Sequence, residues 1–202
     1  MKLLLTSNGL SNKKLGRAFV GLLQKDVKKS RVLVIHTAQK PEHMTFVDNV
    51  GKEISENGIL LPNISYLNIA KGTYKYDIFD YDAVYICGGN TFFILDKMRK
   101  NKLLGALKKY VKSGGLYIGV SAGSIIAGPD ISIAGWGSEG DINEINLKNL
   151  RGLGITNISI FPHYKDKLKK EVDEFRDETG CCVESLKDGQ ALQINGKIIS
   201  KI

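Results

Sequence analysis

Residues 117–126 read YIGVSAGSII, a run of apolar residues that ends where one serine stands between two glycines. The apolar run predicts a buried strand, and the glycines allow that strand to turn sharply into a helix. A serine packs poorly at such a turn, because its hydroxyl competes for backbone hydrogen bonds. The pattern G-x-S-x-G between strand and helix is typical of a nucleophile elbow, a strained turn that exposes the serine hydroxyl.

The segments around this stretch alternate between short β-rich runs and longer helical patterns. Strands are predicted at residues 2–6, 31–37, 63–69, 82–89, 115–120 and 157–161. Apolar residues recur at helical spacing from Leu15 to Leu23, and further helices are predicted at 44–58 and 90–115. Continuous apolar strands that alternate with helices predict an α/β fold, with a mostly parallel sheet covered by helices on both faces.

The pattern changes after Cys181. The runs 181–186, 190–194 and 197–202 are short and β-rich, and turn signals separate the second run from its neighbours. These runs predict short antiparallel C-terminal strands that extend the sheet. Because no linker, low-complexity stretch or internal repeat interrupts the 202 residues, we expect a single domain over residues 1–202.

The composition narrows the class of protein. With 43% hydrophobic and 25% charged residues, the chain is ordinary for a globular domain and is expected to bury a sizeable core. No run approaches the roughly 18 apolar residues that span a bilayer. The apolar run in the opening MKLLLTSNGL is too short for a signal peptide. We therefore expect a cytoplasmic protein that does not contact a membrane.

The net charge of +8 raises the question of a nucleic-acid partner. The lysines fall on several predicted helix faces, and neither an aromatic-interleaved basic stripe nor a nucleic-acid motif accompanies them. We interpret the excess charge as a solvated surface and expect no nucleic-acid partner. The three cysteines form no CxxC pattern, which argues against a metal site and against a disulfide framework.

A serine nucleophile needs a base at neutral pH, and the chain has three histidines. We interpret His43 as a surface residue near a helix start. His36, at the end of a predicted strand, is the more serious rival, although we favour a satisfied, partly buried histidine there. His163 follows a strand and a proline in SIFPHYKD, and we favour it as the base. The strand ends that carry these groups would lie at one edge of a parallel sheet, where ligands bind.

The two glycines of CGGNTF (87–92) allow a backbone N–H to approach a substrate carbonyl. This stretch therefore predicts one half of an oxyanion hole, and the N–H of Ala122 predicts the other half. Taken alone, the same stretch would be a strand-to-helix turn with Asn90 as the helix N-cap. Beside the elbow, we favour the oxyanion hole.

The segments GGNTFFIL (88–95), GVSAGS (119–124) and FPHY (161–164), in this order and on these elements, resemble the serine peptidase family of peptidase E (aspartyl dipeptidase) and cyanophycinase. The resemblance covers roughly Leu3 to His163 and fades in the tail. It implies a flavodoxin-like sheet related to class I glutamine amidotransferases, with serine in place of their cysteine. It also implies Ser121 as nucleophile, His163 as base, Gly89 and Ala122 as oxyanion donors, and Asn90 in the substrate cleft.

The third member of the triad has two candidates by this resemblance. Peptidase E has an acidic residue in a late LPEG-like turn, and the matching LKDG (186–189) offers Asp188, one methylene shorter than the expected glutamate. An aspartate between the serine and the histidine is the other candidate, and Asp141 fills that place better than Asp130, which lies in a PD turn. We favour Asp188 over Asp141.

In peptidase E an arginine after the histidine holds the acidic side chain of the substrate. The corresponding region, 165–180, has no evident matching arginine, so the resemblance does not carry aspartyl specificity to this chain. We interpret three basic residues of this region as a solvated helix face. They are Lys169, Lys170 and Arg176.

The leading hypothesis is a serine peptidase that acts on dipeptides or short peptides, as a monomer or homodimer, and needs no metal or organic cofactor. An acyl transferase or esterase would use the same machinery. The alternative from another class is a binding or regulatory protein that keeps the cleft without efficient catalysis. The missing arginine and the two candidate acids motivate that alternative.

Overall fold

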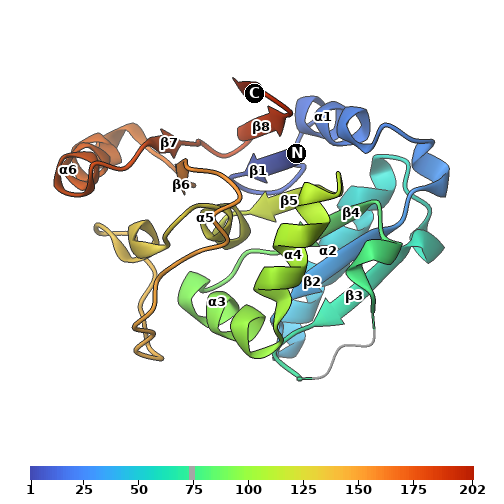
Figure 1. Ribbon diagram of the computed structural model, residues 1–202, viewed down its shortest axis with the longest axis horizontal. Coiled ribbons are helices and arrows are strands. Elements are labelled where there is room, and N and C mark those ends of the chain that lie inside the picture. The colour runs from blue at the N-terminus through green and yellow to red at the C-terminus, as the bar shows by residue number, and fades with distance from the viewer. Residues whose placement is uncertain (73–75) are drawn as a thin grey trace.

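The computed structural model describes residues 1–72 and 76–202, with side chains except those of residues 41–43. A seven-stranded sheet lies at its centre, in the order β3-β2-β4-β5-β1-β8-β9 (Figure 1). Its strands are β1 (Lys2–Thr6), β2 (Val32–His36), β3 (Ile64–Asn68), β4 (Ala83–Ile86), β5 (Leu116–Val120), β8 (Ala191–Asn195) and β9 (Ile198–Lys201). The first five pair in parallel, and β8 and β9 extend the sheet antiparallel. The expected mostly parallel sheet with antiparallel C-terminal strands is confirmed.

Helices cover both faces of this sheet. They are α1 (Lys13–Leu23), α2 (Pro41–Glu56), α3 (Thr91–Lys100), α4 (Leu103–Lys112), α5 (Ala122–Ala127) and α6 (Lys169–Thr179). One hydrophobic cluster joins α1 and α2 to one face through residues such as Phe19 and Ile54, and α3, α4 and α5 pack on the opposite face. On β1, Leu4 belongs to the first cluster, whereas Leu3 and Leu5 belong to the second. Burial on both faces explains why the strands are continuously apolar.

The segment around α6 departs from the sequence prediction. We expected residues 181–186 to extend the sheet antiparallel, but β7 (Val183–Ser185) pairs in parallel with β6 (Ser159–Phe161) in a separate two-stranded sheet. The reason is the connection, because α6 lies between the two strands and a helical crossover returns the chain in the same direction. Figure 1 shows this unit at one end of the molecule.

The carboxyl ends of the parallel strands meet at one edge of the sheet. Thr6, the last residue of β1, pairs with Val120 of β5, and Ile86 of β4 pairs with Gly119. The backbone N–H of Cys87 donates to the carbonyl of Ile35 on β2 at 3.0 Å. These pairings bring the residues that follow four strands side by side.

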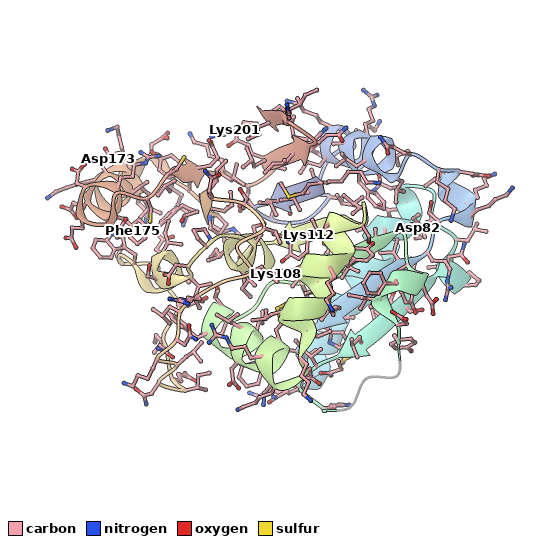
Figure 2. All side chains as sticks on the ribbon, viewed as in Figure 1. Asp82, Lys108, Lys112, Asp173, Phe175 and Lys201 are labelled. Atoms are coloured by element: carbon pink, nitrogen blue, oxygen red, sulfur yellow. The ribbon has the colours of Figure 1, made fainter. Side chains whose placement is uncertain are left out.

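The positive charge is spread over several elements. Lys108 and Lys112 are exposed on α4, and Lys201 lies on β9 (Figure 2). Among the described residues, no helix is long and apolar enough to cross a membrane. The single domain over residues 1–202 and the lack of a nucleic-acid partner stay predictions.

Candidate active site

Ser121 occupies a sharp turn between β5 and α5. Its backbone has φ 48° and ψ −109°, a conformation that a residue with a side chain rarely adopts. A Cβ on Gly119 would lie 2.6 Å from the carbonyl oxygen of Gly123, and one on Gly123 would lie 2.5 Å from that of Ile86. The two glycines are therefore required sterically, because strand and helix approach each other too closely for any larger residue.

The structure brings Ser121, His163 and Asp188 together from three distant parts of the chain. Nε2 of His163 lies 3.0 Å from Oγ of Ser121, and Nδ1 lies 2.7 Å from Oδ1 of Asp188. His163 also has a positive φ of 54°, so two of the three residues hold a strained backbone. This arrangement is the hydrogen-bonded chain that a nucleophile, a base and an orienting acid require.

Ser7, directly after β1, joins the same group and was missed by the sequence reasoning. Its side chain is fully buried, and its Oγ donates to Oδ1 of Asp188 at 2.7 Å. The backbone N–H of His163 donates to the same Oγ at 2.8 Å. One signal in the sequence was available, because Ser7 follows an apolar strand as Ser121 does.

Two glycines that follow β4, Gly88 and Gly89, lie close to Ser121 in a backbone that suits glycine. Gly89 has φ 138°, in the region that glycine tolerates best, and a Cβ on Gly88 would lie 3.4 Å from Cβ of Ser121. Gly89 lies between β4 and α3, and Ala122 is the first residue of α5. Among the described residues, no hydrogen-bond acceptor is found for the backbone N–H of either. Both are thus free to donate to a substrate oxygen.

Asn90 and Ser121 line the same cavity, but the side chain of Asn90 already forms hydrogen bonds within the protein. Its Oδ1 accepts from the backbone N–H of Phe93 at 3.0 Å and so caps α3. Its Nδ2 donates to the carbonyl of Ile142 at 2.8 Å. Both sequence interpretations of Asn90, as an N-cap and as a cleft residue, agree with this position.

Asp141 and Asp130 have other partners than His163. Oδ2 of Asp141 accepts from the backbone N–H of Thr91 at 2.8 Å, at the start of α3. Oδ1 of Asp130 accepts from the backbone N–H of Ser132 at 2.6 Å, within its own turn. The carboxylate at His163 is that of Asp188.

His36 is buried near the site and does not contact Ser121 through a hydrogen bond. His36 is 6% exposed, and its Nδ1 accepts from the backbone N–H of Ala38 at 3.2 Å. Burial, helped by the positive charge of Lys71, lowers the pKa of His36 below its usual value. His36 is thus a satisfied, neutral histidine at the cavity wall. The side chain of His43 lies outside the described residues.

A cavity of about 730 Å³ opens in front of Ser121 and His163. Apolar side chains of α2 and α3, including Phe46, Val50 and Phe93, form much of its wall. Glu53 also lines it, and burial raises the pKa of Glu53 although Tyr85 and the backbone of Leu10 donate to its carboxylate. The cavity thus combines an apolar wall with a few polar groups, as small-ligand sites do.

Cys87, which follows β4, lines the same cavity. Its side chain is buried, and this burial, together with the charge of Glu53, raises the pKa of the Cys87 thiol. A thiol held in its protonated form is a poor nucleophile. Among the described residues, no group of three or more His, Cys, Asp or Glu side chains is arranged to hold a metal ion.

The basic residues of α6 form ion pairs with acidic residues of the same helix. Lys169 and Arg176 both pair with Asp173, at 2.6 and 3.0 Å, and Figure 2 shows Asp173 on this outlying helix. Lys170 lies 3.6 Å from Glu174. The cavity in front of Ser121 is lined by none of these described side chains. Their interpretation as a solvated helix face agrees with these contacts.

One family model matches nearly the whole chain. Its description is peptidase family S51, and the match covers residues 3–202. An uncharacterized peptidase of Listeria monocytogenes is 28% identical over 152 residues, which make up 75% of this chain and 74% of the relative. Peptidase E of Streptomyces coelicolor is 30% identical over 125 residues, or 57% of this chain and 49% of that protein.

Two solved structures share the fold over the full length of the chain. The crystal structure of a protein assigned as a peptidase E from Listeria monocytogenes has a TM-score of 0.78 and 27% identity, and covers 100% of this chain and 97% of the other. That of a peptidase from an acI-B1 actinobacterium has a TM-score of 0.71, with 100% and 86% coverage. Its 15% identity supports the fold alone. Together these findings confirm the resemblance to peptidase E.

Proposed function

Because the chain belongs to peptidase family S51, a family of serine peptidases, we propose that Ser121, His163 and Asp188 form its catalytic triad and cleave dipeptides or short peptides. One observation carries the proposal. An unbroken series of hydrogen-bond distances runs from Oγ of Ser121 through both ring nitrogens of His163 to Asp188.

The first step is the attack of Ser121 on the scissile carbonyl. Nε2 of His163 takes the hydroxyl proton as the Oγ–C bond forms, and the carboxylate of Asp188 stabilises the resulting imidazolium through Nδ1–H. The strained backbone of Ser121 helps, because a turn of this kind exposes the serine hydroxyl, and Ser121 lines the cavity.

The negative charge that develops on the carbonyl oxygen needs donors. The N–H groups of Gly89 and Ala122 would supply two, and each such donor lowers the barrier by about 3 kcal/mol. His163 then gives its proton to the leaving amine, and the C–N bond breaks. Water, activated by the same histidine, releases the acyl group from Ser121. These steps use no metal and no organic cofactor.

The size and wall of the cavity support small substrates. A volume of about 730 Å³ is of the order that small-molecule sites offer. Its wall carries one lysine, Lys40, but none of the basic residues of α6, so the arginine that holds an acidic side chain in peptidase E has no counterpart from that helix. We therefore propose that the substrates are small peptides in which aspartate is not required. We also propose that the protein cleaves them in the cytoplasm as a monomer or homodimer.

The test is release of free amine from a panel of dipeptides by the wild type, Ser121→Ala and Ser65→Ala. Ser65 lies on β3, the edge strand opposite β9, and serves as a matched serine-to-alanine control. We expect hydrolysis by the wild type and Ser65→Ala and none by Ser121→Ala. Turnover that is unchanged in Ser121→Ala would overturn the proposal. Dipeptide binding without turnover in the wild type would favour the binding protein.

A further inference from the structure

Ser7, which follows β1, contacts both the base and the acid of the proposed triad. Its Oγ is 2.7 Å from Oδ1 of Asp188 and 2.8 Å from the backbone nitrogen of His163. We infer that Ser7 is a positioning residue, which fixes the carboxylate of Asp188 against His163. This inference rests on the triad of the proposed function and adds a fourth residue to it.

Counting protons fixes the direction of each hydrogen bond. A backbone N–H only donates, so the Oγ of Ser7 accepts from His163. The single hydroxyl proton of Ser7 is then left for Asp188, whose ionised carboxylate only accepts. The same Oδ1 also faces Nδ1 of His163 at 2.7 Å. Two donors therefore converge on one oxygen of Asp188.

The position of the Asp188 carboxylate sets the tautomer of His163. Because Oδ1 of Asp188 accepts, the ring proton of neutral His163 lies on Nδ1. Nε2 is then left with its lone pair towards Oγ of Ser121, 3.0 Å away, and this is the form that can take a proton. Ser7 thus acts on the reaction through Asp188 and His163, without touching the substrate carbonyl.

Asp188 needs such support because it stands in an open turn. Its side chain is 57% exposed, and it is a short acid in the turn between β7 and β8, two strands that belong to different sheets. Asn8 and Asn12 hold the turn too, but they bind the backbone N–H and the carbonyl of Gly189, at 2.8 and 2.9 Å. Among the described residues, only Ser7 and His163 hydrogen-bond the carboxylate itself.

The experiment measures the rate of covalent labelling by a fluorophosphonate, followed by intact mass over a range of probe concentrations. Ser7→Ala is compared with Ser30→Ala, which also removes a fully buried hydroxyl, one that donates to the carbonyl of Asp26 far from the site. We expect Ser7→Ala to lower the maximal labelling rate about 10- to 100-fold. The probe concentration at half-maximal rate should change little, and Ser30→Ala should label as the wild type does.

A double-mutant cycle separates positioning from general support of the fold. If Ser7 acts through the carboxylate, Ser7→Ala should slow labelling by less than about threefold in an Asp188→Ala background, since coupled residues are not additive. Equal slowing in both backgrounds would overturn the inference. Wild-type labelling by folded Ser7→Ala would overturn it as well.

Two further controls keep the result interpretable. If Ser7→Ala does not fold, Ser7→Cys replaces it, because a thiol fills the site but is a weak donor, and the same loss of maximal rate is expected. Labelling of Ser121→Ala at the wild-type rate would instead defeat the proposed function. Loss of labelling in Ser121→Ala with normal labelling in Ser7→Ala would defeat the inference about Ser7 alone.

Discussion

Nδ1 of His163 lies 2.7 Å from Oδ1 of Asp188, although 25 residues separate them along the chain. The two residues come from different units: His163 follows β6, and Asp188 lies in the turn before β8. Backbone bonds tie these segments together, since the N–H of Tyr164 donates to the carbonyl of Leu186 at 3.0 Å. An aspartate is therefore long enough here to reach the histidine.

The first prediction separates the two candidate acids. Asp188→Asn should lower kcat by about 10²- to 10⁴-fold, because an amide in place of the carboxylate favours the wrong histidine tautomer. Asp141→Asn should leave kcat within about twofold, since the amide oxygen can still cap α3. Steady-state kinetics on a hydrolysed dipeptide gives both values. The reverse order of effects would assign the role to Asp141.

The second prediction concerns the glycine before the elbow. Gly119→Ala should destabilise the fold by about 1–3 kcal/mol, because its Cβ would overlap the backbone of α5. Gly105→Ala is the matched control, on α4, where a Cβ would meet no atom within 4 Å. It should stabilise the protein by about 0.5–1 kcal/mol. Urea unfolding monitors both, and equal effects would argue against the tight elbow.

The third prediction follows from the lowered pKa of His36. Folding keeps this imidazole neutral, so the unfolded chain takes up its proton more readily as the pH falls below 6.5. The stability that His36 contributes is present above this pH and is lost below it.

His36→Asn keeps an acceptor for the N–H of Ala38 and removes the titration. Urea unfolding between pH 5 and pH 8 should therefore show the wild type losing stability relative to His36→Asn towards low pH. A constant difference across this range would contradict the assignment.

The fourth prediction concerns the charge of the substrate. Asp-Leu and Asn-Leu have nearly the same shape, and only the first carries a side-chain charge. Because the basic residues of α6 pair with Asp173 and Glu174 outside the cavity, kcat/KM for Asp-Leu should not exceed that for Asn-Leu. A preference of about tenfold or more for Asp-Leu would contradict this expectation and would place a cation at the substrate side chain, with Lys40 on the cavity wall as the candidate.

Much of this fold could be predicted from local patterns. The continuous apolar strands predicted burial between two helical layers, and the glycines around Ser121 predicted a tight strand-to-helix turn, because both signals act over a few residues. The parallel pairing of β7 with β6 could not be predicted in the same way. It depends on where α6 returns the chain, whereas the run 181–186 by itself only indicates a strand.

In the candidate site, too, the residues in recognisable local segments could be predicted, and the residue that depends on distant contacts could not. Ser121 and His163 stand in short segments that resemble a known family, and Asp188 was reached through a weaker likeness of its turn. Ser7 has no such segment, because its role depends on contacts with residues 156 and 181 positions away. The contact with Asp188 depends on the pairing of β8 with β1, because the two residues lie next to the paired ends of these strands. The catalytic roles of Ser121, His163 and Asp188, and the positioning role of Ser7, stay predictions.

The most direct test of the central claim is intact-mass analysis after incubation with a fluorophosphonate. The comparison includes the wild type, Ser121→Ala and His163→Ala, each shown to be folded. We predict a single adduct on the wild type, none on Ser121→Ala, and much slower labelling of His163→Ala, because the hydroxyl lacks its base. An adduct on Ser121→Ala that forms as fast as on the wild type would contradict the assignment of Ser121 as the nucleophile.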